Sequence, residues 1–161
     1  MATQRPVSAS WRNILQALLL AVSLAACSSD TPEEQIKQYV AAGEEAVENR
    51  DVGDLRDLIS EGYQDNLGRT RRDLVAIAAR YILISKNIHI LTRIDELRFP
   101  AEDRAEFQLF AAMAGQNISD LDALLNMQAD LYRFDLEVHR EEGEWKLVRS
   151  DWRPAKAVDF F

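Results

Sequence analysis

The sequence predicts an α+β fold in which three N-terminal helices pack on a curved, mostly antiparallel sheet of four or more strands. Two observations lead to this prediction. Apolar residues recur at helical spacing between residues 33 and 85, and from residue 88 to residue 152 they mostly alternate with polar residues. Because the helical segments all precede the strand segments, the order favours helices gathered on one face of a sheet over alternating strand–helix units.

Three helices are expected before the sheet. The first is predicted over residues 33–50, with an apolar stripe opposite its acidic faces: Ile36, Val40, Gly43 and Val47. The second, in residues 51–60, is too short to be stable without packing. Thr70 and Asp73 resemble a capping pair. The third helix, which follows this pair, presents one apolar face: Leu74, Ile77, Ala78, Tyr81 and Ile82.

The first strand, over residues 87–99, contains a break in its alternation. Its apolar residues fall into two sets of opposite parity: Ile88, Ile90 and Ile94, then Leu97 and Phe99. A continuous strand buries both sets only if one residue is inserted. The pattern therefore predicts a β-bulge or sharp bend near Asp95 and Glu96.

Three further strands complete the predicted sheet. Residues 105–115 place Phe110 on one face and a larger apolar set on the other: Phe107, Leu109, Ala111 and Met113. The clearest hairpin turns at Gly143, and its strands carry Tyr132, Phe134, Leu136 and Val138, then Trp145, Leu147, Val148 and Trp152. Between the second and third strands, residues 115–128 form an insertion in which Ser119 is predicted to cap a short helix that acts as a flap.

The front of the chain has the order of a secretory signal. Arg5 and Arg12 precede an apolar run from Ile14 to Ala26, with no acidic residue before Cys27. This run is shorter than the roughly 20 residues of a permanent membrane span. We therefore expect residues 1–26 to be a cleaved signal peptide.

Leu24, Ala25, Ala26 and Cys27 resemble the lipobox of bacterial lipoproteins, in which the cysteine is lipidated and becomes the first residue. The resemblance implies acylation of Cys27; an ordinary signal or a core cysteine is the alternative. Residues 27–32 are then a lipidated tether, and residues 33–161 form one domain. Ser28 follows the cysteine where an aspartate would retain an enteric lipoprotein at the inner membrane. The implied location is the periplasmic face of the outer membrane, with the acyl chains as the membrane contact.

Charge and cysteine content narrow the function further. The whole chain has a formal charge of −8, and the predicted signal contains two arginines and no acid, so the remainder is more acidic still. A negatively charged domain has no electrostatic attraction for the phosphate backbone of nucleic acid, which argues against nucleic acid as a partner. With one cysteine there is no disulfide within the chain, and stability must come from the core.

The order of elements, the bent first strand and the closing sequence EWKLVRSDWRPA resemble the nuclear transport factor 2-like superfamily over residues 33–156. This resemblance implies a cone of curved sheet wrapped over three helices. Cystatin-like folds and ferredoxin-like folds are the alternatives. Members of the superfamily include ketosteroid isomerases and dehydratases with an acid, histidine or tyrosine in the pocket, and many others bind ligands or assemble proteins without chemistry.

Catalysis in such a cone requires an acid or base inside an apolar cavity. The residues available are Asp95, Asp135, Asp151, Tyr63, Tyr81, His89 and His139. Asp135 and His139 alternate out of phase with the apolar set of their strand and are predicted to face solvent. Asp95, which a bend would re-aim inwards, is the one weak catalytic candidate. No metal site or cofactor is predicted, because two histidines fifty residues apart do not make a ligand set and no phosphate-binding loop is present.

Five aromatic residues are candidates for a pocket lining: Tyr81, Phe110, Tyr132, Phe134 and Trp152. Trp152 with Arg149 and Arg153 is an alternative rim for an anionic or amphipathic ligand. The leading interpretation is a membrane-anchored lipoprotein without catalytic activity that binds a small apolar ligand or an envelope protein partner. An isomerase or dehydratase with an interior acid is the first alternative, and a homodimeric scaffold is the second.

Overall fold

The structure, a computed structural model, describes residues 30–116 and 129–160. Its helices are α2 (Pro32–Glu48), α3 (Val52–Asp57) and α4 (Arg71–Ile84). The strands β1 (His89–Ala101), β2 (Arg104–Ala114), β3 (Asp130–Glu141) and β4 (Glu144–Pro154) follow, with the short helix η2 (Ala157–Phe160) at the end. The predicted order of three helices and four strands is confirmed. The predicted signal peptide, Cys27 and the helix of the insertion lie outside the described residues.

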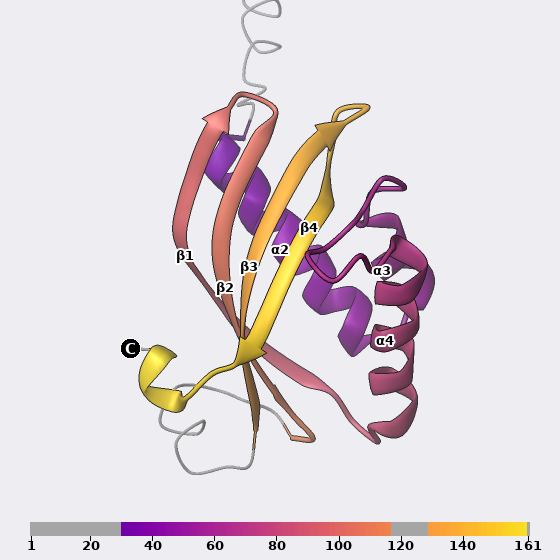
Figure 1. The fold of residues 1–161 in the computed structure, drawn as a ribbon. Coiled ribbons are helices and arrows are strands. Elements are labelled where there is room, and N and C mark those ends of the chain that lie inside the picture. The colour runs from indigo at the N-terminus through magenta and orange to yellow at the C-terminus, as the bar shows by residue number, and fades with distance from the viewer. Residues whose placement is uncertain (1–29, 117–128, 161) are drawn as a thin grey trace, which may run out of the picture. The chain divides into compact units, whose positions relative to one another are not determined.

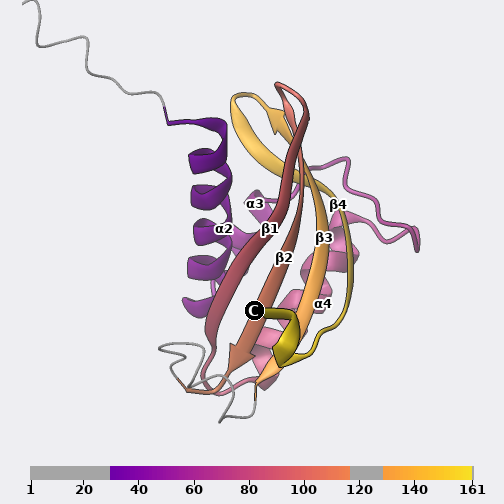
Figure 2. The same cartoon turned by 90° about the vertical axis from the view of Figure 1, so that its left-hand side faces the viewer.

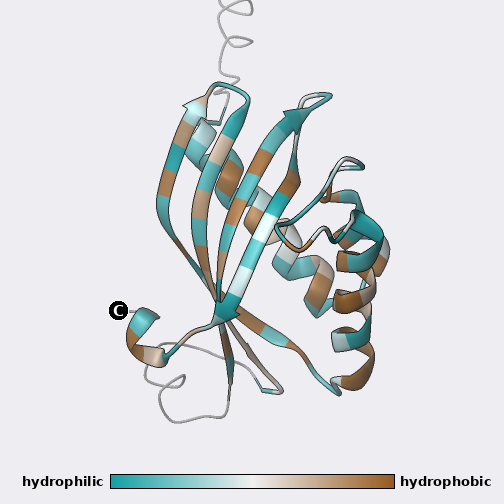
Figure 3. Ribbon diagram, viewed as in Figure 1, coloured by the Kyte–Doolittle hydropathy of each residue, from teal (hydrophilic) through white to brown (hydrophobic). Residues whose placement is uncertain are grey.

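The four strands form one antiparallel sheet in the order β1-β2-β3-β4, so every chain neighbour is a sheet neighbour. Figures 1 and 2 show long, curved strands with α2 crossing one face of the sheet. Hydrophobic and hydrophilic residues alternate along these strands (Figure 3), because side chains point to opposite faces in turn. One face therefore packs on the helices, and the other carries polar side chains and a smaller apolar cluster around Phe110.

The predicted break in β1 is confirmed. The pairing of β1 with β2 shifts register between Asp95 and Arg98, and Glu96 has a φ of 49°. Because the bulge inserts a residue, Ile94 before it and Leu97 and Phe99 after it all pack against the same core. The bulge therefore lets one strand turn both of its apolar sets inwards.

β4 also contains a bulge, which was not predicted from the sequence. Register with β3 shifts between Glu137 and Val138, which leaves Val148 as the extra residue between the paired Leu147 and Arg149. Trp145 and Leu147 are buried before it, and Ser150 is buried after it. The shift explains why the apolar residues of this strand change parity.

The outer edge of β4 is covered by the segment that follows α3. Ser60 N donates to Leu147 O at 2.9 Å, and Leu147 N donates to Leu58 O at 2.9 Å. Ile59 thereby forms a parallel bridge with Leu147 beside the bulge. An edge strand paired in this way is protected from pairing with other chains at this point.

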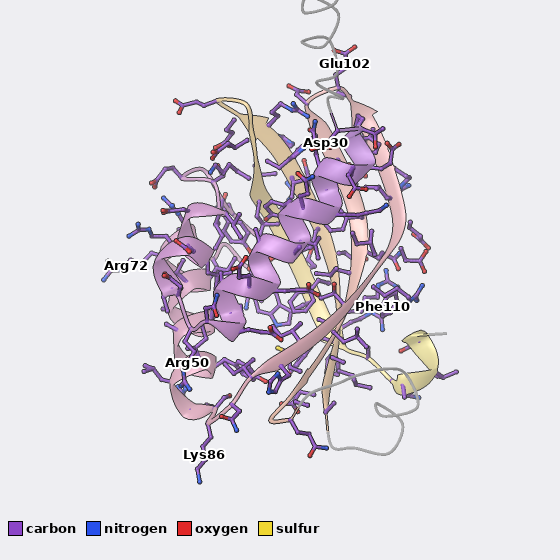
Figure 4. All side chains as sticks on the ribbon, turned by 180° about the vertical axis from the view of Figure 1, so that it is seen from behind. Asp30, Arg50, Arg72, Lys86, Glu102 and Phe110 are labelled. Carbon is purple, nitrogen blue, oxygen red and sulfur yellow. The ribbon has the colours of Figure 1, made fainter. Side chains whose placement is uncertain are left out.

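Arg50 joins the ends of two helices. Its backbone, with a φ of 61°, closes α2 through Arg50 N to Val47 O at 3.1 Å and Asp51 N to Ala46 O at 2.7 Å, the Schellman arrangement. Its guanidinium donates to three carbonyls at the end of α4: those of Ile82, Ser85 and Lys86. Figure 4 shows Arg50 and Lys86 at the same end of the helical layer. Arg50 thus donates hydrogen bonds to carbonyl groups at the ends of both helices, where such groups lack a partner within the helix.

The start of α4 is capped as predicted. The Asp73 carboxylate accepts from the Thr70 backbone nitrogen at 2.9 Å and from the Thr70 hydroxyl at 2.8 Å. These bonds hold the pKa of Asp73 below its usual value. They fix the direction in which α4 leaves the preceding loop.

The main core fills the end of the domain that holds the two hairpin turns. Ile36 and Val40 of α2 pack there against Phe107, Val138 and Trp145 of the sheet. Phe99 adds a tilted ring contact to Trp145 at a centroid distance of 6.4 Å. This end of the interior is a packed core.

Replacement of Glu142 by Asn is expected to stabilise the domain by about 0.5 kcal/mol, because Asn tolerates a left-handed backbone better than Glu. Glu142 and Gly143 form the two-residue turn between β3 and β4, with φ values of 53° and 91°. Urea unfolding measures the change. Glu102→Asn in the other hairpin turn, where φ is not positive, is the control; an equal gain in both variants would contradict the explanation.

Candidate functional site

A cavity of about 350 Å³ lies at the other end of the domain, away from the hairpin turns. All three helices and all four strands contribute to its lining. Most of the strand residues that line it belong to the start of β1 and β3 and the end of β2 and β4, including Thr92, Met113, Tyr132 and Trp152. The sheet and helices therefore enclose a packed core at one end and a cavity at the other.

Three aromatic side chains form one wall of the cavity. The rings of Tyr132 and Phe134 lie 6.1 Å apart between centroids, and those of Phe134 and Trp152 lie 6.3 Å apart. Phe134 and Trp152 lie side by side because the pairing of β3 with β4 places these two residues opposite each other. We call these three residues the aromatic wall.

Arg69, which is not part of the cavity lining, contacts the Trp152 ring of the aromatic wall. Its guanidinium carbon lies 3.9 Å from the centroid of the Trp152 ring, at the distance of a cation–π contact. The buried Asp65 carboxylate holds Arg69 by accepting from its Nε at 2.5 Å and its backbone nitrogen at 2.9 Å. Burial acts to raise the pKa of Asp65, but the hydrogen bonds from Arg69 and Leu67 outweigh it and keep that pKa below the usual value.

The helices supply an aliphatic wall that faces the sheet. It is made of Val40, Val47, Leu55, Leu58, Leu74, Ile77, Ala78 and Ile82. Ile77 is 43% exposed although it also lines the cavity. The cavity therefore reaches the surface at α4.

The four tyrosines of the chain all lie in or beside this cavity. Tyr39, Tyr81 and Tyr132 line it, and the buried Tyr63 lies behind Ser150, with 2.7 Å between the two hydroxyl oxygens. Tyr39 donates its hydroxyl to Leu58 O at 3.3 Å. Burial raises the pKa values of Tyr39, Tyr63 and Tyr81 above 10.0. The hydroxyls therefore stay protonated at physiological pH and can donate hydrogen bonds.

Of the five aromatic residues predicted to line a pocket, Tyr81, Tyr132, Phe134 and Trp152 do line this cavity. Phe110 does not, and its prediction is wrong. It is 6% exposed on the opposite face of β2, in a second cluster with Ala112 and Ala114, and Arg93 lies over its ring at 4.7 Å. Phe110 (labelled in Figure 4) alternates with Leu109 and Ala111, which line the cavity, so it must point the other way.

Asp95 does not line the cavity. Its side chain is 46% exposed and pairs with Arg93 at 3.1 Å. The bulge begins after Asp95, so the bend does not re-aim its side chain inwards as the sequence analysis suggested. Hydrogen bonds from Glu96 N and Arg93 hold the pKa of Asp95 below its usual value, the opposite of what a general acid requires.

The other predicted acids and histidines also lie away from the cavity. Asp135 pairs with Arg133 at 2.6 Å, and His139 lies 2.8 Å from Glu137. Asp151 accepts from Asn66, and His89 is not part of the lining. Within residues 30–116 and 129–160, no group of three or more His, Cys, Asp or Glu is placed to hold a metal ion, and no helix is long and apolar enough to cross a membrane.

Four polar residues of the lining were not predicted from the sequence: Tyr39, Glu44, Thr92 and Ser150. Tyr39 and Glu44 each adjoin a residue of the predicted apolar stripe of α2, so their position on the helix was the available signal. Ser150 comes inwards only because of the bulge at Val148. Arg69, rather than Arg149 or Arg153, is the cation at Trp152.

Known proteins are similar to this chain in fold. No protein family model and no curated protein matches the sequence. A putative scytalone dehydratase from Novosphingobium aromaticivorans has a TM-score of 0.62 at 14% identity, over 77% of this chain and 84% of that chain. A hexachlorocyclohexane dehydrochlorinase, LinA-type3 from Novosphingobium barchaimii, has a TM-score of 0.57 at 14% identity, over 77% and 86%. An NTF2-like protein of unknown function from Pseudomonas putida has a TM-score of 0.53 at 16% identity, over 74% and 84%. The chain has the nuclear transport factor 2-like fold.

Replacement of Tyr39 by Phe is expected to weaken the loss of stability at alkaline pH. Burial raises the pKa of Tyr39 in the folded state, so unfolded Tyr39 ionises first and stability falls as pH rises above 10.0. Tyr39→Phe removes this contribution, at a cost of about 1 kcal/mol at neutral pH for the lost hydrogen bond. Urea unfolding at about pH 8 and about pH 11 measures both effects; an unchanged alkaline loss would contradict the assignment.

Proposed function

We propose that this chain is a lipoprotein of the outer membrane that binds a small apolar ligand in its periplasmic domain. The observation that carries the proposal is the cavity of about 350 Å³, with its aromatic wall on the sheet and its aliphatic wall on the helices. Ligand sites in proteins are typically concave, mostly apolar and equipped with a few placed polar groups. Here those groups are three tyrosines, Thr92, Ser150 and Glu44.

The size of the cavity limits the ligand. An engineered apolar cavity of about 150 Å³ accepts benzene, which has six carbon atoms. By that proportion, a cavity of 350 Å³ suits a ligand on the order of 14 non-hydrogen atoms. A bicyclic aromatic compound or a similar apolar molecule is of this size.

Binding is favoured over acid–base catalysis by the location of the ionisable groups. Proteins with similar folds include a putative dehydratase and a dehydrochlorinase, and an enzyme of that kind needs an acid or base at the substrate. Asp95, His89 and His139 lie outside the cavity, and Glu44 is the one carboxylate among the described lining residues. The isomerase or dehydratase alternative therefore depends on Glu44 acting without a second ionisable partner other than tyrosine.

The dimeric scaffold alternative is disfavoured by the outer face of the sheet. That face has an apolar cluster at one end, around Phe110. The rest of it carries ion pairs between Arg93 and Asp95, Arg104 and Glu106, and Arg133 and Asp135. An obligate dimer interface is usually hydrophobic. Arg93 also donates to Asp159 O at 2.8 Å, which holds the C-terminal segment against this face.

Filling the cavity is expected to abolish binding without loss of stability. Ala111 lines the cavity between its neighbours Thr92 and Tyr132, so a phenylalanine side chain there occupies the ligand volume. N-phenyl-1-naphthylamine, a neutral apolar dye, is expected to gain fluorescence with the wild-type domain and not with Ala111→Phe. Ala111→Ser keeps the volume and is the control. Equal dye binding by the Phe variant, with unfolding midpoints unchanged, would contradict the proposal.

Replacement of Cys27 by Ser is expected to release the protein from membranes. The proposed thioether forms only on a cysteine sulfur, and stable anchoring requires more than one acyl chain. Incorporation of labelled palmitate and fractionation of the cell envelope measure the effect, with Ser28→Ala as the control. Membrane recovery of Cys27→Ser equal to that of the wild type would contradict lipid anchoring.

A further inference from the structure

We propose that the ligand carries a positive charge on a planar aromatic body, as an aryl-alkyl amine does. This inference rests on the proposed binding function and specifies the chemical class of the ligand. Three features of the cavity carry it: an uncompensated carboxylate, an absence of cations among the described lining residues, and a wall of three aromatic rings.

Glu44 is the source of negative charge in the cavity. The lining among residues 30–116 and 129–160 includes this one carboxylate and no Lys, Arg or His. No hydrogen bond or ion pair joins Glu44 to another described residue, whereas Glu48, one turn later on α2, accepts from Ile90 N at 2.8 Å. A half-buried carboxylate without a partner costs free energy. A cationic group of the ligand recovers that free energy and gains a charge-assisted hydrogen bond.

The aromatic wall adds attraction for the same charge. Ring faces are electron-rich and attract cations within about 6 Å. Trp152 already receives the Arg69 guanidinium on its outer side. Tyr132 and Phe134 present their rings beside it, and no hydrogen bond joins the Tyr132 hydroxyl to another described residue. That hydroxyl is available to a polar group of the ligand.

The same arrangement selects against anions. Fatty acids are abundant apolar molecules at a membrane, but a carboxylate in this cavity meets Glu44, and the described lining residues include no cationic side chain. Like charges at short range in an apolar site repel strongly. The chain as a whole, with a formal charge of −8, also attracts cations from solution and repels anions.

Three compounds with one ring system separate charge from shape: 2-naphthylmethylamine, 2-naphthylmethanol and 2-naphthoate. Isothermal titration calorimetry of the soluble domain at neutral pH is expected to give tighter binding of the amine than of the alcohol by roughly tenfold, as a charge-assisted hydrogen bond provides. Naphthoate is expected to bind more weakly than the alcohol. Glu44→Gln is expected to remove the advantage of the amine over the alcohol.

Glu45→Gln is the matched control, because it makes the same change in net charge at an exposed position on α2 outside the lining. It is expected to keep the preference for the amine. Equal affinities for the three compounds, or an equal loss of preference in both variants, would overturn the charge inference while leaving apolar binding intact. If neither the naphthyl compounds nor N-phenyl-1-naphthylamine bind the wild-type domain, the proposed function itself is wrong.

Discussion

The bulge in β1 between Asp95 and Arg98 lets a single strand contribute to both the hollow and the filled part of the interior. Before it, Ile90 and Thr92 line the cavity. After it, Leu97 and Phe99 pack into the core with Trp145. Without the inserted residue, one of these two sets faces solvent, since a shift of one position exchanges the faces of a strand. The bulge therefore allows one continuous strand to build both ends of the domain.

The bulge at Val148 in β4 lies at almost the same level of the sheet. Pairing across the strands aligns Arg98 with Glu106, Glu137 and Arg149, and Val148 is the next residue along β4. Both edge strands therefore change parity where the packed core ends and the cavity begins. β2 and β3, between them, pair without interruption. Bulges increase the local bend and twist of a strand, and two at one level explain the curvature visible in Figures 1 and 2.

The sequence allowed part of this arrangement to be predicted. The apolar residues of β1 change from even to odd positions, and this change required the bulge: Ile88, Ile90 and Ile94 precede it, and Leu97 and Phe99 follow it. The apolar residues of β4 change position in the same way, from Trp145 and Leu147 to Trp152. This change was not noticed because the inserted residue, Val148, is itself apolar. The alternation of β2 placed Phe110 on the outer face, yet its aromatic character led to the wrong prediction that it lines the pocket.

Contacts between distant parts of the chain were beyond prediction. Arg69 meets Trp152, and Arg50 meets the end of α4, only because loops bring these segments together. Glu44 resembles the other acids of α2 in the sequence, and only the fold separates it from them by placing it in the cavity lining. Periodicity reveals which face of an element is buried, whereas the partner of a polar side chain depends on tertiary structure.

The central claim is that the hollow end of the domain holds a small ligand in the cell. Native mass spectrometry of the native protein, purified in mild detergent from its own cells, tests this claim most directly. The account predicts a complex with one small molecule of about 14 non-hydrogen atoms that carries an amine or another cationic group. Recovery of the protein without any bound molecule, or with fatty acid in the cavity, would contradict it.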